Sequence, residues 1–214
     1  FRESLMNTMY DLDGPRESPF EMTEDEDFIA LVFRSYVEVD SCVDILADVS
    51  CYARRSPDKK FGIPMYRFFQ YHFGNYLNEI YILKERLERF YKIVLRKYKK
   101  KLSAQEFAFY EQKFEAIIEN LEAVKQTRNN HIHQLRYSNE DISRLSLLGF
   151  FTSDDFKDVK DVIYPLAITK TRKEFVRIVE GSIDSINKLL DDFYGTLEKV
   201  IFDEEGEYIN PFTF

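Results

Sequence analysis

The chain has 214 residues and a net charge of −8, with 44% hydrophobic and 32% charged residues. This length suits one domain with short appendages. Seven Gly and six Pro are few for the length, which favours long elements over the many reversals of a β-sandwich or β-barrel. The 20 Phe and 14 Tyr exclude a disordered chain, because they supply ample apolar area for a core.

Membrane and redox signals both indicate a cytoplasmic protein. No segment approaches the ~18 consecutive apolar residues of a membrane span, so we expect no membrane association. Cys42 and Cys51 are nine residues apart in one predicted helix. That spacing puts them on opposite faces and ~13 Å apart along the axis, too far for a disulfide. We expect both to be buried thiols, as in a reducing compartment.

The first half of the chain predicts an arm and two long helices. Residues 1–24 are acidic and contain Asp13-Gly14-Pro15, which is typical of an arm outside the core. Apolar residues at steps of three and four predict a helix over about 25–54 and a longer one over about 65–101. The apolar stripe of the second helix consists of Phe69, Phe73, Leu77, Ile80, Leu83, Leu87, Tyr91, Val94 and Tyr98.

The second half predicts further helices and a tail. Ser103 and Glu106 form a capping box that begins a third helix, whose stripe runs through Phe107, Tyr110, Phe114, Ile117 and Leu121 toward Leu135. A short helix is expected over about 139–151, followed by a less regular stretch that contains Pro165. A last long helix is expected over about 171–202, and residues 203–214 form a polar C-terminal tail. The fold prediction is therefore an all-α, up-and-down bundle of four to five long helices over residues 25–202.

Positive charge gathers at the end of the second helix. Residues 84–101 hold nine basic residues and two acidic ones. One interpretation is a solvated helix face with a basic last turn. The other is a patch for phosphates or an acidic partner, in which Arg96, Lys97, Lys99 and Lys100 would contact an RNA substrate.

Polar chemistry concentrates in residues 127–134, Thr-Arg-Asn-Asn-His-Ile-His-Gln. Arg128 and His131 fall on the apolar stripe of the third helix, which indicates a cleft or a subunit interface there. Three interpretations are open. The segment is a capped helix end, or a metal site built on His131 and His133, although no nearby Cys or carboxylate completes a ligand set. The third is metal-independent phosphoryl chemistry with Arg and His.

The segment Arg128-Asn129-x-x-x-His133 resembles the Arg-x4–6-His signature of the HEPN superfamily. The predicted layout is similar too, since two long helices precede the motif and another follows it. HEPN domains are all-α bundles in toxin–antitoxin, abortive-infection and other phage-defence proteins. The resemblance implies a homodimer that joins two copies of the motif in one composite site, and metal-independent cleavage of RNA through attack of the ribose 2′-hydroxyl.

The resemblance also implies roles for single residues. Arg128 would neutralise charge on the phosphorane, His133 would act as general base or acid, and Asn129 would hold the polar network of the site. His131 lies in the variable spacer, where packing and phosphate contact are both open. The resemblance implies no metal or cofactor, and an antitoxin or other partner protein is expected. The alternative is a non-catalytic HEPN-like module that binds a nucleotide or a protein.

The spacing of the motif constrains its geometry. At ~100° per residue, the side chains of Arg128 and His133 do not share a face of a straight helix. Either the helix is broken near Thr127, or the site is completed across a two-fold interface.

Overall fold

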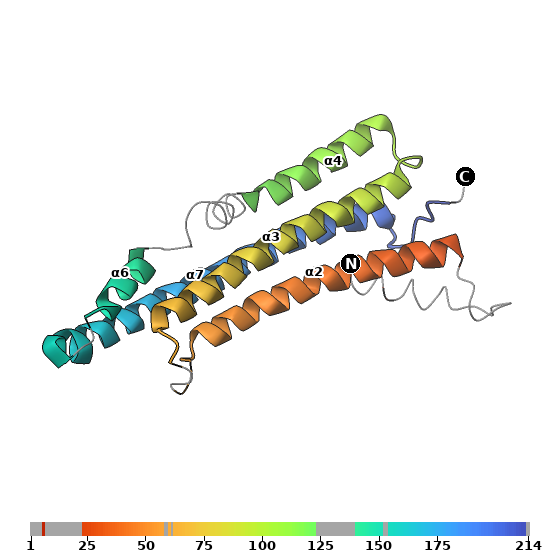
Figure 1. The fold of residues 1–214 in the computed structure, drawn as a ribbon. Helices are drawn as coiled ribbons and strands as arrows, with labels where there is room; N and C mark the ends of the chain where they lie inside the picture. Colours follow the sequence, from red (N-terminus) through yellow and green to blue (C-terminus); the bar gives the residue numbers. More distant parts are fainter. Residues whose placement is uncertain are drawn as a thin grey trace. The chain divides into compact units, whose positions relative to one another are not determined.

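A computed structural model shows an all-α protein, in which most of the described residues are helical (Figure 1). The structure describes residue 6, residues 23–57, residue 60, and residues 62–122, 140–151 and 154–212. Within these ranges the only β-type pairing is an isolated bridge between Phe202 and Tyr208. The predicted helical bundle is thus confirmed. The α-helices are α2 (Glu24–Ala53), α3 (Met65–Tyr98), α4 (Ala104–Glu119), α6 (Glu140–Gly149) and α7 (Tyr164–Ile201).

The helices distribute over two compact units. Unit 1 comprises residues 1–41, 83–120 and 187–214, and unit 2 comprises residues 42–82 and 121–186. One part of each of the helices α2, α3 and α7 therefore belongs to unit 1 and the other part to unit 2. Helix α4 belongs to unit 1 and α6 to unit 2.

Aromatic rings from three helices form the centre of unit 1. Phe193 of α7 is fully buried, and its ring centroid lies 5.2 Å from that of Phe114 in α4 and 5.9 Å from that of Phe90 in α3. Phe114 in turn stacks on Tyr91 at 5.1 Å. Such offset and edge-on ring pairs add to the free energy of burial. These contacts hold α3, α4 and α7 together in this unit.

Unit 2 has a core of the same kind. The ring of Phe175 in α7 lies 6.3 Å from Phe69 and 5.3 Å from Phe73, both in α3. A short hydrogen bond crosses the same interface, in which the Tyr76 hydroxyl donates to Ser182 Oγ at 2.6 Å. Arg54, just after α2, pairs with Glu180 of α7 at 2.5 Å. Packing and polar contacts therefore join α2, α3 and α7 in unit 2.

The predicted stripe of the second helix is confirmed in full, because all nine of its residues are buried. The capping box is confirmed as well. The Glu106 N–H donates to Ser103 Oγ at 3.2 Å, and the Ser103 N–H donates to a Glu106 carboxylate oxygen at 2.8 Å. Helix α2 starts with an equivalent box of Thr23 and Glu26, which was not predicted from the sequence.

Three local expectations were wrong. Helix α3 ends at Tyr98 rather than at residue 101, because the amides of Lys101 and Leu102 both donate to the Tyr98 carbonyl in a turn. In α4 the buried isoleucine is Ile118, while Ile117 is only half-buried. Cys51 is exposed rather than buried; neither it nor the buried Cys42 forms a disulfide.

The stretch around Pro165 is also more regular than expected. A π-helical turn, η3 (Val159–Ile163), leads directly into α7. Pro165 lacks an amide hydrogen, and its ring clashes with the carbonyl four residues earlier in a regular α-helix. The proline is tolerated in the first turn of α7 because the preceding turn is wider, so the last helix begins seven residues before the predicted start at about 171.

Candidate functional site

The predicted catalytic motif lies outside the described residues. Arg128, Asn129, His131 and His133 fall in residues 123–139, so their roles stay predictions. The helix before the motif ends at Glu119, where the Asn120 side-chain amide donates to the carbonyls of Ala116 and Ile117 at 3.2 and 3.1 Å. The next described residue after the motif is Glu140, the first residue of α6.

The first half of the basic run on α3 serves the packing of unit 1. Lys84 is buried and pairs with Glu88 at 2.6 Å, one helical turn away. Arg86 donates to the Glu38 carbonyl at 2.5 Å, and Arg89 pairs with the Glu38 carboxylate. Arg86 and Arg89 thus join α3 to α2, and the two carboxylates offset the charge of Lys84 and Arg89 within the unit, whereas none of these three residues is among the predicted RNA contacts.

The second half of the run is exposed. Arg96, Lys97, Lys99 and Lys100 all lie on the surface at the end of α3 and in the following turn. The Lys97 ammonium sits 4.8 Å from the ring centroid of Phe212, and the Lys99 ammonium 6.0 Å from that of Phe107. Cation–π contacts of this kind hold the chains in place and leave their charge available to an anion.

A shallow hollow of about 440 Å³ runs along α3 beside these residues, and its lining is mixed in charge. Arg89, Lys92 and Arg96 contribute bases, but Glu85 and Glu88 line the same hollow. Glu88 also pairs with Lys92 at 3.7 Å. The hollow is therefore less suited to a phosphate than the exposed end of α3.

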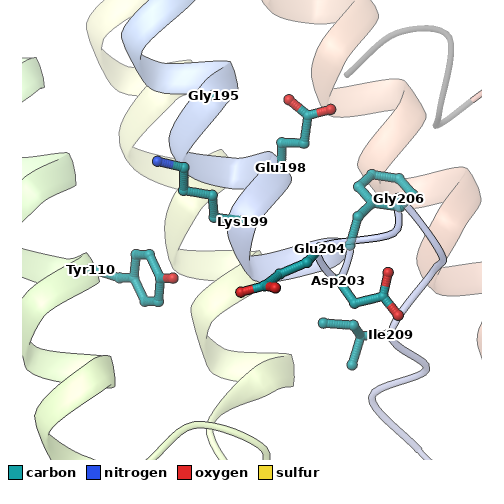
Figure 2. A pocket seen from close by; sticks show the side chains of 9 residues that line it. Tyr110, Gly195, Glu198, Lys199, Asp203, Glu204, Gly206 and Ile209 are labelled. Atoms are coloured by element: carbon teal, nitrogen blue, oxygen red, sulfur yellow. The ribbon is translucent and has the colours of Figure 1, made fainter.

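A larger hollow of about 710 Å³ lies in unit 1 where α4, the end of α7 and the chain after it meet (Figure 2). The Tyr110 ring faces it from α4, Glu198 and Lys199 come from α7, and Glu204 from the following turn. Burial and the nearby Glu106 carboxylate raise the pKa of Tyr110. Three of its lining residues are acidic (Glu198, Asp203 and Glu204) and one, Lys199, is basic, so the charged part of the lining favours a cationic group.

This hollow was not predicted, because residues 203–214 have the composition of a polar tail. The Asp203 carboxylate accepts hydrogen bonds from the amides of Glu205 and Glu207 at 3.1 and 2.8 Å, and Gly206 adopts a φ of 83°. This tight turn reverses the chain and forms one wall of the hollow. The signal present in the sequence was the Asp-x-x-Gly turn followed by the apolar Tyr208 and Ile209.

The chain after this turn packs onto unit 1. The Tyr98 hydroxyl donates to the Ile209 carbonyl at 2.7 Å, and the Tyr208 hydroxyl donates to the Asp25 carboxylate at 3.1 Å. The ring of Phe212 lies edge-on to Phe28 at 6.4 Å. These contacts join the C-terminal chain to the start of α2 and the end of α3.

Burial shifts the pKa values of several ionisable side chains. Burial raises the pKa of Tyr98 and of Tyr208, with a further contribution from Asp25 to both. Burial, aided by Glu115, raises the pKa of Tyr91 to about 12. Burial lowers the pKa of His72, which lies among the rings of Tyr52, Phe68 and Tyr71.

Within the described ranges, no three His, Cys, Asp or Glu side chains are arranged to hold a metal ion. None of the described helices is both long and apolar enough to cross a membrane. Comparisons with protein-family models, with curated proteins and with solved structures found no match to this chain.

Proposed function

We propose that this protein is a metal-independent endoribonuclease of the HEPN type, acting as a toxin or phage-defence effector. The observation that carries the proposal is the Arg128-Asn129-x-x-x-His133 motif, which lies in sequence between helices α4 and α6 of an all-α chain. Guanidinium binds phosphate through two parallel hydrogen bonds, and imidazole exchanges protons near neutral pH, so the two groups suit phosphoryl chemistry without a metal.

The proposed reaction is a transesterification within the RNA. The ribose 2′-oxygen attacks the adjacent phosphorus, the bond from phosphorus to the 5′-oxygen breaks, and a 2′,3′-cyclic phosphate and a 5′-hydroxyl result. One imidazole accepts the 2′-hydroxyl proton and another donates a proton to the leaving oxygen. A two-fold dimer would supply both as His133 and His133 of the partner subunit, while Arg128 offsets the added negative charge on the phosphorane.

The exposed end of α3 supports the proposal. Arg96, Lys97, Lys99 and Lys100 present positive charge to solvent, as an RNA-binding surface requires. The net charge of −8 repels the phosphates of RNA at long range. A local basic surface is therefore needed to bind the substrate.

A direct test is to incubate the purified protein with total RNA in excess chelator and to map the product ends. We expect 2′,3′-cyclic phosphate ends, and we expect His133→Ala to lower the cleavage rate ~10²–10⁴-fold, as removal of a general acid or base typically does. His131→Ala is the matched control and should lose less. Loss of activity on chelation, or equal inactivity of the wild type and His133→Ala on RNA, contradicts the proposal.

The second candidate is a non-catalytic HEPN-like module that binds a nucleotide or a protein. The observation that favours it is the internal use of Lys84, Arg86 and Arg89, which reduces the basic surface available to a long RNA. An intact protein that binds RNA or a nucleotide without cleaving RNA would support this candidate.

A further inference from the structure

Another hollow, of about 360 Å³, lies in unit 2 between α6 and the start of α7. We call it the α6–α7 hollow. Its lining residues recur along each segment mostly at steps of three and four, so each set shares one helix face. The set on α6 consists of Asp141, Arg144 and Leu148, and the set that begins at the last residue of η3 consists of Ile163, Leu166, Ala167, Lys170 and Thr171.

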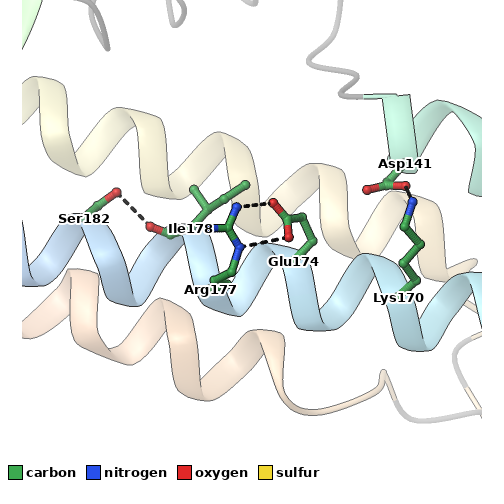
Figure 3. A network of polar contacts seen from close by, with 6 residues as sticks. All are labelled: Asp141, Lys170, Glu174, Arg177, Ile178 and Ser182. Carbon is green, nitrogen blue, oxygen red and sulfur yellow. Dashed lines mark hydrogen bonds and ion pairs between the residues drawn. The ribbon is translucent and has the colours of Figure 1, made fainter.

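Contacts at both ends of α6 fix the two helix faces against each other. Lys170 Nζ lies 2.9 Å from a carboxylate oxygen of Asp141, as Figure 3 shows. At the other end, the backbone of Gly149 comes close to Tyr164, since a Cβ on this glycine would lie 3.9 Å from the tyrosine ring. Asp141 is thus opposite Lys170, and Gly149 is opposite Tyr164. The two segments therefore run antiparallel along the hollow.

This antiparallel register separates the polar lining of the hollow from its apolar lining. The charged side chains of Asp141, Arg144 and Lys170 belong to the half at which the ion pair lies. Leu148 and Ile163 belong to the other half. The span from Asp141 to Leu148 is on the order of 10 Å, at a helical rise of ~1.5 Å per residue. The hollow therefore suits an elongated molecule that is apolar along most of its length and polar at one end.

The charges of the lining favour an anionic group at the polar end. One acidic and two basic side chains leave this end with a net charge of +1. Lys170 is paired with Asp141, whereas Arg144 lies on the surface and forms no ion pair with any described residue. A guanidinium binds a carboxylate through two parallel hydrogen bonds. Arg144 is therefore suited to hold a carboxylate.

Thr171 adds a buried hydroxyl to the same end of the hollow. This residue lines the hollow and is only 3% exposed. Thr169 and Thr196 lie in the same helix, and each donates to the carbonyl four residues earlier, at 2.9 and 2.7 Å. The hydroxyl of Thr171 forms no hydrogen bond with any described residue. A buried polar group without a partner lowers stability, and a ligand in the hollow supplies the partner.

We propose that the α6–α7 hollow binds a small carboxylic acid with an elongated apolar chain. Arg144 binds the carboxylate, and the Thr171 hydroxyl donates a hydrogen bond to it. The chain covers Ile163 and Leu166, which are 43% and 65% exposed, and so removes their apolar surface from water. The volume of about 360 Å³ lies within the ~300–1,000 Å³ of typical small-molecule sites. This site is separate from the proposed ribonuclease motif.

The proposal is tested by isothermal titration calorimetry of the full chain with octanoate, 1-octanol and octylamine. At neutral pH these probes have the same chain and carry a negative charge, no charge and a positive charge. We expect octanoate to bind about tenfold tighter than octanol, because a hydrogen bond to a charged group contributes that much. Octylamine should bind most weakly. Equal affinities for octanoate and octanol, or no binding of octanoate, would overturn the proposal.

Arg144→Gln should lower the affinity for octanoate about tenfold and leave that for octanol unchanged, because only the contact with the carboxylate is lost. Arg144 is exposed, so the helical circular dichroism should not change. Arg177→Gln is the matched control, since it removes the same charge from unit 2 at a residue that pairs with Glu174 and does not line the hollow (Figure 3). Wild-type affinity for octanoate in the Arg144→Gln protein contradicts the assignment of the site.

Thr171→Val tests the hydroxyl both with and without the probe. The Tm of the free protein should not fall, whereas Thr196→Val should lower it through loss of the hydrogen bond to the Asp192 carbonyl. The affinity of Thr171→Val for octanoate should be lower than that of the wild type. A lower Tm together with unchanged affinity would overturn the role given to Thr171. His133→Ala should bind octanoate like the wild type, so failure of the ribonuclease proposal is distinguishable from failure of this one.

Discussion

Phe193 shows how much of unit 1 depends on single aromatic side chains. Its ring is fully buried between Phe90 of α3 and Phe114 of α4. Phe193→Ala leaves a cavity at the point where three helices meet, so we expect the free energy of unfolding to fall by ~3–5 kcal/mol. Urea denaturation followed by circular dichroism measures this loss.

The control for this substitution is Phe109→Ala. Phe109 is 60% exposed, and removal of an exposed side chain usually changes the free energy of unfolding by no more than about 0.5 kcal/mol. Equal losses for the two variants would show that burial of Phe193 does not stabilise the unit as described.

At the scale of an element, α3 combines two tasks. Its first basic residues bind Glu38 and Glu88 within unit 1, and its last ones are exposed at the C-terminal end. The charge count of residues 84–101 could not separate the two groups, because the partner Glu38 is far away in sequence. The residues at the C-terminal end lie on the surface, where an anion can reach them.

Replacing Arg96, Lys97, Lys99 and Lys100 together with Gln should weaken RNA binding and flatten its dependence on salt. Each lost phosphate contact removes the release of about one counterion. Fluorescence anisotropy with a short labelled RNA at several salt concentrations measures both effects. The matched control is Lys157, Lys173, Arg177 and Lys188 replaced with Gln, which removes equal charge from other exposed positions. The same salt slope in both variants would exclude the end of α3 as an RNA contact.

At the scale of the whole molecule, stability should fall steeply in alkali. In the folded chain, the pKa of Tyr98 and of Tyr208 is raised above the ordinary value of 10.0, mainly by burial. Raised folded-state values mean that the stabilisation is fully present below pH ~10. Above that pH, tyrosines of the unfolded chain lose protons that the folded chain retains, so the free energy of unfolding decreases.

This pH dependence is measured by urea denaturation between pH 8 and pH 12, a window on the order of that over which tyrosine titrates. Tyr98→Phe should flatten the decline, although it lowers stability at neutral pH through loss of the hydrogen bond to Ile209. Tyr71→Phe is the control, because Tyr71 is 66% exposed. A wild type with constant stability up to pH 12 would contradict the described burial of these hydroxyls.

The sequence by itself determined the helices and most of the inward faces. Periodicity of apolar residues predicted the complete stripe of α3, because side chains three and four apart share a helix face whatever surrounds them. The capping box of Ser103 and Glu106 was predictable for the same reason, since all of its hydrogen bonds are local.

Only the tertiary structure decided which surfaces remain available for function. The division into two units, the contacts of Arg86 and Arg89 with Glu38, and the hollow beside Tyr110 all depend on residues far apart in the chain. Apolar periodicity shows that a side chain favours burial, but its burial depends on a partner that the local sequence does not contain. Phe150 and Leu166 are the clearest case, because both side chains are large and apolar and yet are 78% and 65% exposed.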